Sequence, residues 1–387
     1  MISLQTILLH EYEQLTEIIK LPLRVMKAAE AIMGCRTAAM GGRLEYCPEG
    51  HHERILFNSC RHRFCPRCGY VAAAQWLEKT KAMLLACPYH HVTFTLPPRL
   101  HDLWVYNREV MMDIFFRVVR DTLFLLLADT KYGGFLPGMI CSMHTWGRSM
   151  PLHPHIHCLV TAGGLVGGLL WVRAKKKTLL PYLVVRRIYR GKMLDAIRKA
   201  LKGGQLVLPP GISRETMEST LNKLSQEEWN AEISEQYAHG NGVVEYLSRY
   251  IRGTPIANKQ ILSYDSHAVS FLYRDHRDNQ EKVMTLSAVE FLKRLLKHVP
   301  PAKKKTVRYF GLYAESNRDL LNRSRAALDQ KDYEAPDSPT WEALWQGSPE
   351  EKPNLCPTCH RPLILGRRIP KWECIHPGMV SPGREAA

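Results

Sequence analysis

Two histidines separated by one residue lie in an apolar run of the sequence, at positions 155 and 157. Residues two apart on a β-strand point to the same face of a sheet, so His155 and His157 project together, and His153 joins them if the strand is already extended there. Ile156 then points the other way, into a core. Two imidazoles on one face can hold a divalent ion and leave positions open for a substrate. The alternative is a histidine-rich edge strand that binds no metal.

Two tyrosines four residues apart are candidate nucleophiles. Residues 241–255 predict a short helix, because Asn241 can cap its start and a glycine and a proline mark its end. Tyr246 and Tyr250 share one face of that helix, which differs from its apolar stripe. A tyrosine phenolate can attack phosphorus and store the bond energy as a phosphotyrosine. Taken alone, the pair is equally explained as two half-buried aromatic side chains.

The densest group of metal-binding residue types lies between residues 35 and 68. Within it, Cys65-Pro66-Arg67-Cys68 predicts a knuckle that places two thiolates on one tight turn, and zinc takes four soft or borderline ligands in a tetrahedron. The alternatives are unmetallated thiols or two zinc ions. We expect the ligands to come from Cys35, Cys47, His51, His52, Cys60, Cys65 and Cys68.

The C-terminal part of the sequence carries a second, smaller group of this kind. A second zinc site is predicted there from Cys356, Cys359, Cys374 and His376. The chain has 11 cysteines, and those outside the two groups are isolated and typical of buried small apolar residues. This uneven placement indicates metal sites in a reducing cytosol rather than a disulfide framework.

The charge balance indicates a polyanionic partner. The sequence has 53 Lys and Arg against 37 Asp and Glu, a formal net charge of +16. The alternative is a basic soluble protein without such a partner. The longest apolar run, residues 123–128, is too short to span a bilayer, so no membrane partner is expected. Candidate DNA contacts are Arg61, Arg63, Arg67, Lys175, Lys176, Lys177 and Arg249.

Several elements must position these residues. Residues 91–97 alternate as a strand, residues 101–129 predict a long amphipathic helix, and residues 138–146 predict a strand antiparallel to the histidine strand. That pairing brings His144 towards the metal, unless it is a core histidine. The predicted division is a helical segment (1–34), a zinc-binding module (35–70), the main domain (71–313), a linker (314–355) and a C-terminal tail (356–387).

The histidine strand and the tyrosine helix, found in this order, resemble the HUH endonucleases, named for His-hydrophobe-His. Within them the chain is similar to the two-tyrosine transposases of the insertion sequence 91 family. The resemblance covers most of the chain: the cysteine-rich start, His144-Thr145-Trp146-Gly147, the histidine strand, Tyr246-Leu247-Ser248-Arg249-Tyr250 and Arg308-Tyr309-Phe310-Gly311-Leu312. It departs at Gly50, where the related chains usually carry a cysteine, and His51 or His52 could replace that ligand.

The resemblance implies an α+β fold, with an HUH domain of antiparallel central sheet and flanking helices, an N-terminal zinc module and a small tail. It implies Mg²⁺ or Mn²⁺ at the histidines, structural Zn²⁺, and rolling-circle transposition through 5′-phosphotyrosine intermediates. The expected partners are single-stranded DNA at element ends and target, and a host helicase or replication machinery, in the cytoplasm at a bacterial nucleoid. The alternatives are a rolling-circle replication initiator or relaxase with the same chemistry, and a non-catalytic zinc-dependent DNA-binding protein.

Overall fold

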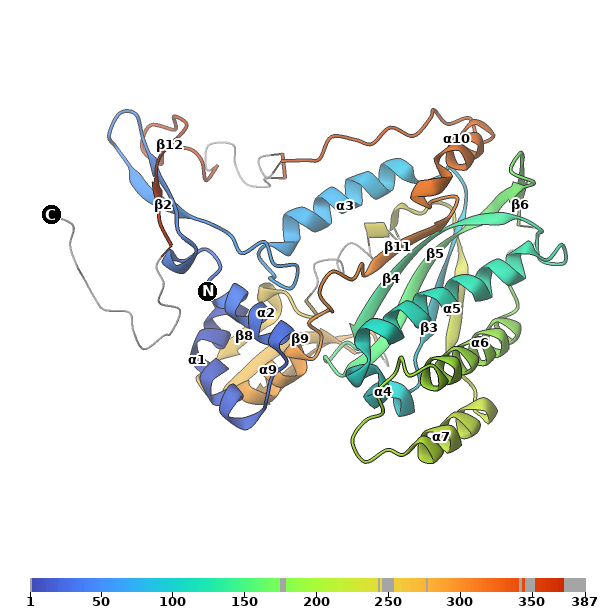
Figure 1. Ribbon diagram of the computed structural model, residues 1–387. Helices are drawn as coiled ribbons and strands as arrows, with labels where there is room; N and C mark the ends of the chain where they lie inside the picture. The colour runs from blue at the N-terminus through green and yellow to red at the C-terminus, as the bar shows by residue number, and fades with distance from the viewer. Residues whose placement is uncertain are drawn as a thin grey trace.

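The computed structural model describes residues 2–174, 179–242, 244–245, 254–275, 278–340, 343–344 and 352–371. It is an α+β protein whose strands pair antiparallel in three sheets (Figure 1). The largest sheet has six strands, in the order β11-β4-β5-β3-β7 with β6 also paired to β5. Their bounds are β3 Tyr89–Thr95, β4 Leu136–Trp146, β5 Leu152–Val166, β6 Leu170–Arg173, β7 Ala231–Tyr237 and β11 Val307–Gly311.

The histidine strand, β5, lies in the middle of this sheet. It pairs with β4 on one side and with β3 on the other, both antiparallel, as the sequence predicts. The strand is therefore central, and the alternative of an edge strand is wrong. A central strand has both backbone edges hydrogen-bonded, which fixes the direction of its side chains.

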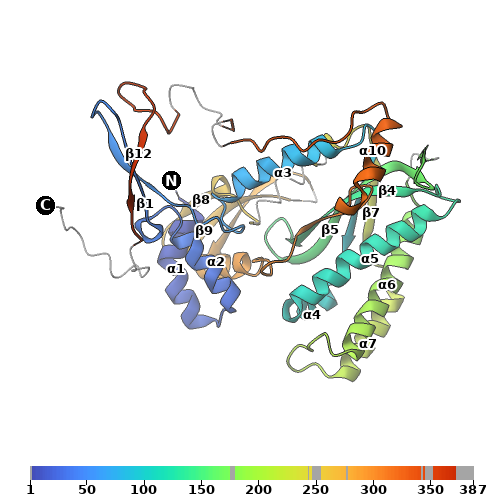
Figure 2. The ribbon, with the colours of Figure 1, turned by 45° about the horizontal axis from the view of Figure 1, so that its top comes forward.

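One face of the large sheet is covered by helices that lie between its strands in sequence. The main cover is α5 (Arg108–Ala128) and α6 (Tyr182–Lys202), with α7 (Arg214–Gln226) outside them (Figures 1 and 2). Ile156 of β5 is fully buried in this layer, among aromatic rings such as Phe115 and Tyr189, whose centroids lie 5.9 Å apart. The even-numbered side of the histidine strand therefore faces a core, as predicted.

The predicted single helix over residues 101–129 is two helices. The first, α4 (His101–Tyr106), ends at Asn107, whose φ of −129° and ψ of 36° are not helical, and α5 begins at the next residue. The Asn107 amide donates to the Leu103 carbonyl at 2.9 Å, and its oxygen accepts from the Val207 N–H at 2.7 Å. These side-chain bonds stabilise the break, which the continuous apolar pattern conceals.

The opposite face of the sheet is covered by α3 (Gly69–Met83) and α10 (Arg318–Ala326), which Figure 1 shows on the other side from α5 and α6. The apolar cluster on this face includes Leu159 of β5, Ile140 of β4 and Val244. Leu159 lies two residues after His157, so this cluster continues the face on which the histidines lie.

The helical start of the chain packs against a much later part of it. Helices α1 (Leu4–Ile18) and α2 (Leu23–Met33) share one core with α9 (Ala288–Leu296). The same core includes a three-stranded sheet, β10-β9-β8, formed by β8 Ile261–Tyr264, β9 Ala268–Arg274 and β10 Glu281–Ser287. Strands β8 and β9 pair antiparallel, and β10 extends them by a third strand.

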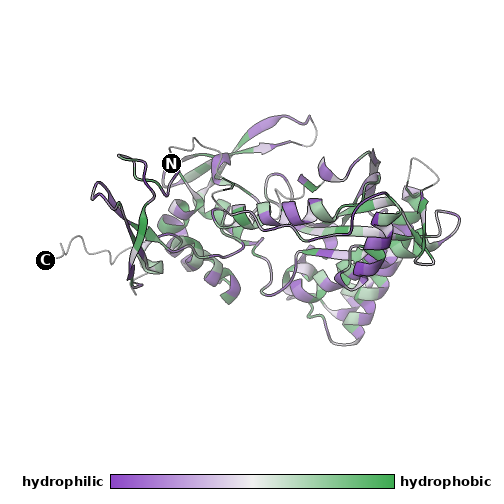
Figure 3. Ribbon diagram, turned by 90° about the horizontal axis from the view of Figure 1, so that it is seen from above, coloured by the Kyte–Doolittle hydropathy of each residue, from purple (hydrophilic) through white to green (hydrophobic). Residues whose placement is uncertain are grey.

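The third sheet joins two segments from opposite parts of the sequence. It consists of β1 (Gly42–Tyr46), β2 (Glu53–Phe57) and β12 (Ile364–Ile369), in the order β12-β1-β2. In Figure 3 hydrophobic segments concentrate where helices pack on sheets, and hydrophilic segments lie on outer turns and helices. Within the described residues, none of the helices has the length and apolar character needed to cross a bilayer.

Candidate functional site

Three histidines meet on one face of the large sheet. His155 lies directly opposite His144 of β4 in the antiparallel register, and His157 lies two residues further along β5. One ligand atom from each of the three lies within 4.8 Å of the others. Two strands with fixed register therefore present three imidazoles to one point, which is the arrangement that a divalent ion requires.

Burial keeps these imidazoles uncharged. It lowers the pKa of His155 to about 4, and it lowers the pKa values of His144 and His157 well below their usual range, with the neighbouring histidines adding to the effect. All three rings are therefore neutral at pH 7. Neutral imidazole is the form that binds a metal, so no proton has to be displaced from the ligand atoms.

Hydrogen bonds fix which ring nitrogen is offered. The Nδ1 atom of His155 lies 2.6 Å from the His153 carbonyl oxygen, an acceptor, so this nitrogen carries the proton and Nε2 keeps its lone pair. The Nδ1 atom of His157 lies 2.8 Å from Nε2 of His91 and 3.2 Å from Oγ1 of Thr93. These contacts use the Nδ1 atom of each ring, so Nε2 is the candidate ligand atom of both His155 and His157.

The third member of the group is His144 rather than His153. The His153 ring lies beside His155, at 5.1 Å between centroids, but it is not part of the three-histidine group. Its backbone carbonyl instead orients His155. The signal for His144 is present in the sequence, because the predicted strand pairing places it next to the histidine strand.

Sequence reasoning missed His91, which contacts the group from β3. It lies on the predicted strand at 91–97 and faces the same side of the sheet as Thr93, two residues later. Thr93 pairs with His157 in the register of β3 and β5. The His91 and His157 rings stack with centroids 4.9 Å apart. The alternation of that strand, read together with the pairing, could have identified it.

Three neutral imidazoles on a rigid sheet fit a borderline divalent ion. Mg²⁺ prefers oxygen ligands, whereas Mn²⁺ accepts imidazole more readily, and both leave positions for phosphate oxygens or water. Next to the histidines, the Trp146 ring stacks on His144 with centroids 5.5 Å apart. His155 is half-buried whereas His144 and His157 are buried, so the group opens on the His155 side.

Tyr246, Arg249 and Tyr250 lie outside the described residues, but the residues just before them do not. The chain is helical at 241–242 and 244–245, within the range predicted for the tyrosine helix. Val244 is fully buried in the cluster that contains Leu159, and the Glu245 carboxylate lies 2.7 Å from the Lys81 amine on α3. The start of this helix therefore lies on the histidine face of the sheet.

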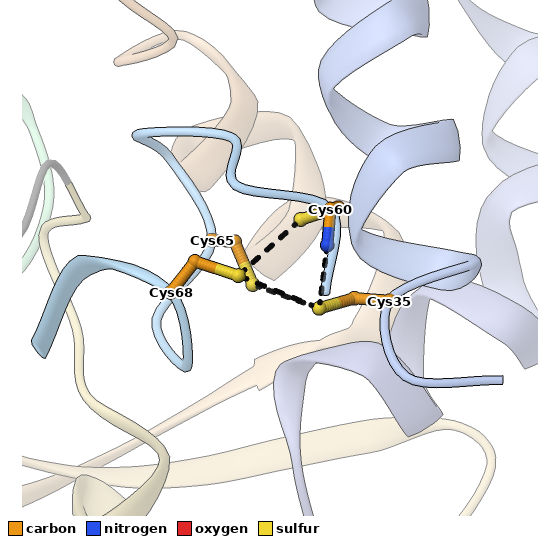
Figure 4. Close-up of side chains that lie close together, drawn as sticks. All are labelled: Cys35, Cys60, Cys65 and Cys68. Atoms are coloured by element: carbon orange, nitrogen blue, oxygen red, sulfur yellow. Dashed lines mark hydrogen bonds between the residues drawn. The ribbon is translucent and has the colours of Figure 1, made fainter. Parts of the chain in front are cut away.

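Four of the predicted zinc ligands form one compact group, shown in Figure 4. The sulfur of Cys68 lies 3.6 Å from those of Cys35 and Cys60, and the sulfur of Cys65 lies 3.7 Å from that of Cys35. Zinc–sulfur bonds of about 2.3 Å in a tetrahedron place sulfurs roughly 3.8 Å apart. The group fits one zinc ion and joins the end of α2 to the start of α3.

The other predicted ligands are divided differently from the sequence expectation. Cys47 and His51 lie with Cys356 and Cys359, within 4.8 Å of one another. His52 belongs to neither group within the described residues, and Cys374 and His376 lie outside those residues. The expected single N-terminal ligand set is therefore split in two. The cause is the pairing of β12 with β1, a long-range contact that no local pattern reveals.

The predicted DNA contacts also differ among themselves. Arg61 and Arg67 are exposed. Arg63 is half-buried and donates to the carbonyl oxygens of Pro301 and, at 2.6 Å, Lys304, so its guanidinium fastens the cysteine loop to the segment after α9. Residues 175–177 lie outside the described residues.

Comparisons with known proteins agree with this architecture. Residues 138–319 match a family described as "Putative transposase", and residues 7–96 match a "Transposase zinc-binding domain". The chain is 35% identical to "Putative transposase y4qJ" of Sinorhizobium fredii over 88% of each chain. It is 32% identical to the transposase for insertion sequence element IS801 of Pseudomonas savastanoi pv. phaseolicola, over 75% of this chain and 69% of that one.

No solved structure matches the chain. The two family matches include both groups of side chains described above, since 138–319 includes the histidine strand and 7–96 includes the four-cysteine group. The cysteine group therefore lies in a zinc-binding domain, and one of the relatives is named as the transposase for an insertion sequence element. The chain belongs to the insertion sequence 91 family of transposases.

Proposed function

We propose that this transposase nicks and joins single-stranded DNA at the ends of its element, through 5′-phosphotyrosine intermediates, in rolling-circle transposition. The observation that carries the proposal is the group of three neutral histidines on a central strand, with the start of the Tyr-x3-Tyr helix on the same face of the sheet. A nucleophile and a site for an ion on the phosphate are the two requirements of this chemistry.

Each part of the site has a separate task. His144, His155 and His157 would hold Mg²⁺ or Mn²⁺, which would supply Lewis-acid polarisation of the scissile phosphate. The phenolic oxygen of Tyr246 or Tyr250 attacks phosphorus, the phenol gives up its proton, and the 3′ oxygen leaves as a hydroxyl. One phosphodiester bond is exchanged for another, so joining needs no nucleotide hydrolysis.

The two tyrosines allow two such exchanges. One holds the 5′ phosphate of the first cut strand while the other acts at the second end or the target. Helical spacing places residues four apart about 6 Å apart along the axis, so one ion can serve either hydroxyl after a small shift. The sequence contains nothing resembling a Walker motif, so duplex unwinding falls to a host helicase or the replication machinery.

The experiment is to locate the covalent adduct. The wild-type protein and the variants Tyr246→Phe and Tyr250→Phe are incubated with Mn²⁺ and single-stranded oligonucleotides from both element ends, and adducts are found by peptide mapping. We expect adducts at both tyrosines, each lost in its own variant. The change to phenylalanine keeps the ring and removes only the hydroxyl, so a loss reports chemistry rather than folding. If neither tyrosine ever carries DNA, a non-catalytic DNA-binding protein is the better description.

A further inference from the structure

The second group of metal-binding side chains joins parts of the chain that are 312 residues apart. The sulfur of Cys47 lies 3.5 Å from that of Cys359 and 3.9 Å from Nδ1 of His51. Sulfur atoms in a tetrahedral zinc site are expected roughly 3.8 Å apart, whereas a disulfide requires about 2.05 Å. The distances fit a shared metal ion and do not fit a covalent bond between the thiols.

Both pairs of ligands lie on tight turns that backbone hydrogen bonds hold in place. In the C-terminal turn the Thr358 N–H donates to the Cys356 sulfur at 3.4 Å, and the Cys356 N–H donates to the Arg361 carbonyl at 2.8 Å. In the hairpin turn the Gly50 N–H donates to the Cys47 carbonyl at 2.9 Å. An N–H directed at a sulfur stabilises a thiolate, which is the form that binds zinc.

We propose that a second zinc ion clamps the segment 352–371 to the β1–β2 hairpin. Its ligands are Cys47, His51, Cys356 and Cys359. The hairpin turn supplies only one thiolate, because Gly50, with φ of +76°, occupies the position three residues after Cys47. His51 provides the second ligand of that turn. The site goes beyond the transposition chemistry, and its test needs no catalysis.

Contacts around the ion site hold the same two segments together. Strand β12 pairs with β1 from Gly42↔Ile369 to Tyr46↔Ile364. An ion pair joins Arg361 to Glu49 at the two turns, and Arg54 donates both to Glu45 and to the Pro353 carbonyl. The ion therefore completes a module built jointly by the two segments.

The test is the zinc content of the full-length protein, measured by native mass spectrometry together with elemental analysis. We expect two zinc ions per chain in the wild type, and one after Cys356→Ser with Cys359→Ser or after His51→Ala. The matched controls His52→Ala and Cys374→Ser with His376→Ala should keep two. One zinc ion in the wild type, or two in the Cys356→Ser/Cys359→Ser protein, would overturn the proposal.

Two further outcomes separate the proposed ligands from their neighbours. Loss of one zinc ion in the Cys374→Ser/His376→Ala protein, with retention in His51→Ala, would place the ion in the tail alone and refute the clamp. If the serine variant does not fold, the cobalt-substituted wild type decides. Its absorption should contain a four-thiolate centre and a three-thiolate, one-imidazole centre, and a four-thiolate spectrum alone would refute the second site.

Discussion

The orientation of the His157 ring is fixed by two side chains of the neighbouring strand, β3. Its Nδ1 atom lies within hydrogen-bond distance of both His91 and Thr93, so the ring cannot turn without losing a contact. His155 is held in the same way by the His153 carbonyl. An ion at this site thus meets ligands whose direction is set by the sheet, which lowers the entropic cost of binding it.

Replacing both histidines of the strand should abolish nicking. In His155→Ala/His157→Ala the polarising ion is no longer held, and a loss of about a thousandfold in cleavage rate is expected from several kcal/mol of transition-state stabilisation. The rate is measured on single-stranded oligonucleotides with Mn²⁺. Binding of the oligonucleotide should stay within about twofold, and His267→Ala, which changes an exposed histidine, should cleave normally. Nicking at the wild-type rate by the double variant would refute the metal assignment.

His91 should affect the ion without being a ligand of it. In His91→Ala the His157 ring loses a partner, and such changes typically weaken metal affinity about 10- to 100-fold. We expect the Mn²⁺ concentration for half-maximal cleavage to rise by that factor, while the rate at saturating Mn²⁺ stays close to wild type. His91→Gln retains an acceptor and should recover most of the affinity. A fall in the saturating rate with unchanged Mn²⁺ dependence would argue against this role.

At the scale of elements, alternation and strand pairing predicted the middle of the large sheet and missed strand β7 at one edge. Strands β3, β4 and β5 were expected, because each has an apolar side to bury. Strand β7 was not predicted, since it pairs with only one neighbour and carries Glu232 and Gln236 in place of an apolar run. Strand β12 contains Gly366 and two arginines, and only its distant partner makes it a strand.

The beginning of the tyrosine helix is anchored by Val244. This side chain is fully buried against the sheet, so Val244→Ala should lower the free energy of unfolding by about 1–3 kcal/mol. Because the anchor precedes both tyrosines, the yield of covalent adduct should fall more than stability alone explains. Thermal unfolding and adduct yield at 20 °C below the transition are the measurements. Val207→Ala, at a residue that is 65% exposed, is the control. Equal effects of the two changes on stability and adduct yield would contradict the anchoring role of Val244.

At the scale of the whole molecule, metal sites join segments that the chain itself keeps apart. The four-cysteine group connects α2 to α3, and α2 shares its core with α9 and the sheet β8–β10. Sequence patterns predicted the cysteine ligands but not the core that α2 shares with α9 and the sheet β8–β10. Segments that pack together from distant parts of the chain leave no periodic pattern in the local sequence of either one. The zinc-binding part is therefore continuous with a core formed by residues from both halves of the chain.

Removal of zinc should destabilise the protein in a way that manganese does not reverse. A chelator strong enough to remove zinc from thiolate sites should lower the unfolding temperature and abolish cleavage. Without its ion, the four-cysteine group no longer holds the segment between α2 and α3 in place. Cleavage should return only when Zn²⁺ and Mn²⁺ are both restored. Calorimetry and the cleavage assay follow the two steps separately. Full recovery with Mn²⁺ alone would contradict a structural role for zinc.

The sharing of one core by distant segments also determines when the protein can fold. The Leu4 N–H donates to the side chain of Asn258, 254 residues later, and Glu11 accepts from Tyr264. At about 5–20 residues per second, the ribosome needs roughly 10–50 s to supply those partners. Until then α1 and α2 lack the residues of α9 and of the sheet β8–β10 that cover their apolar faces in the folded protein. A nascent chain that stops short of Asn258 therefore leaves the apolar faces of α1 and α2 uncovered, and this core can form only near the end of synthesis.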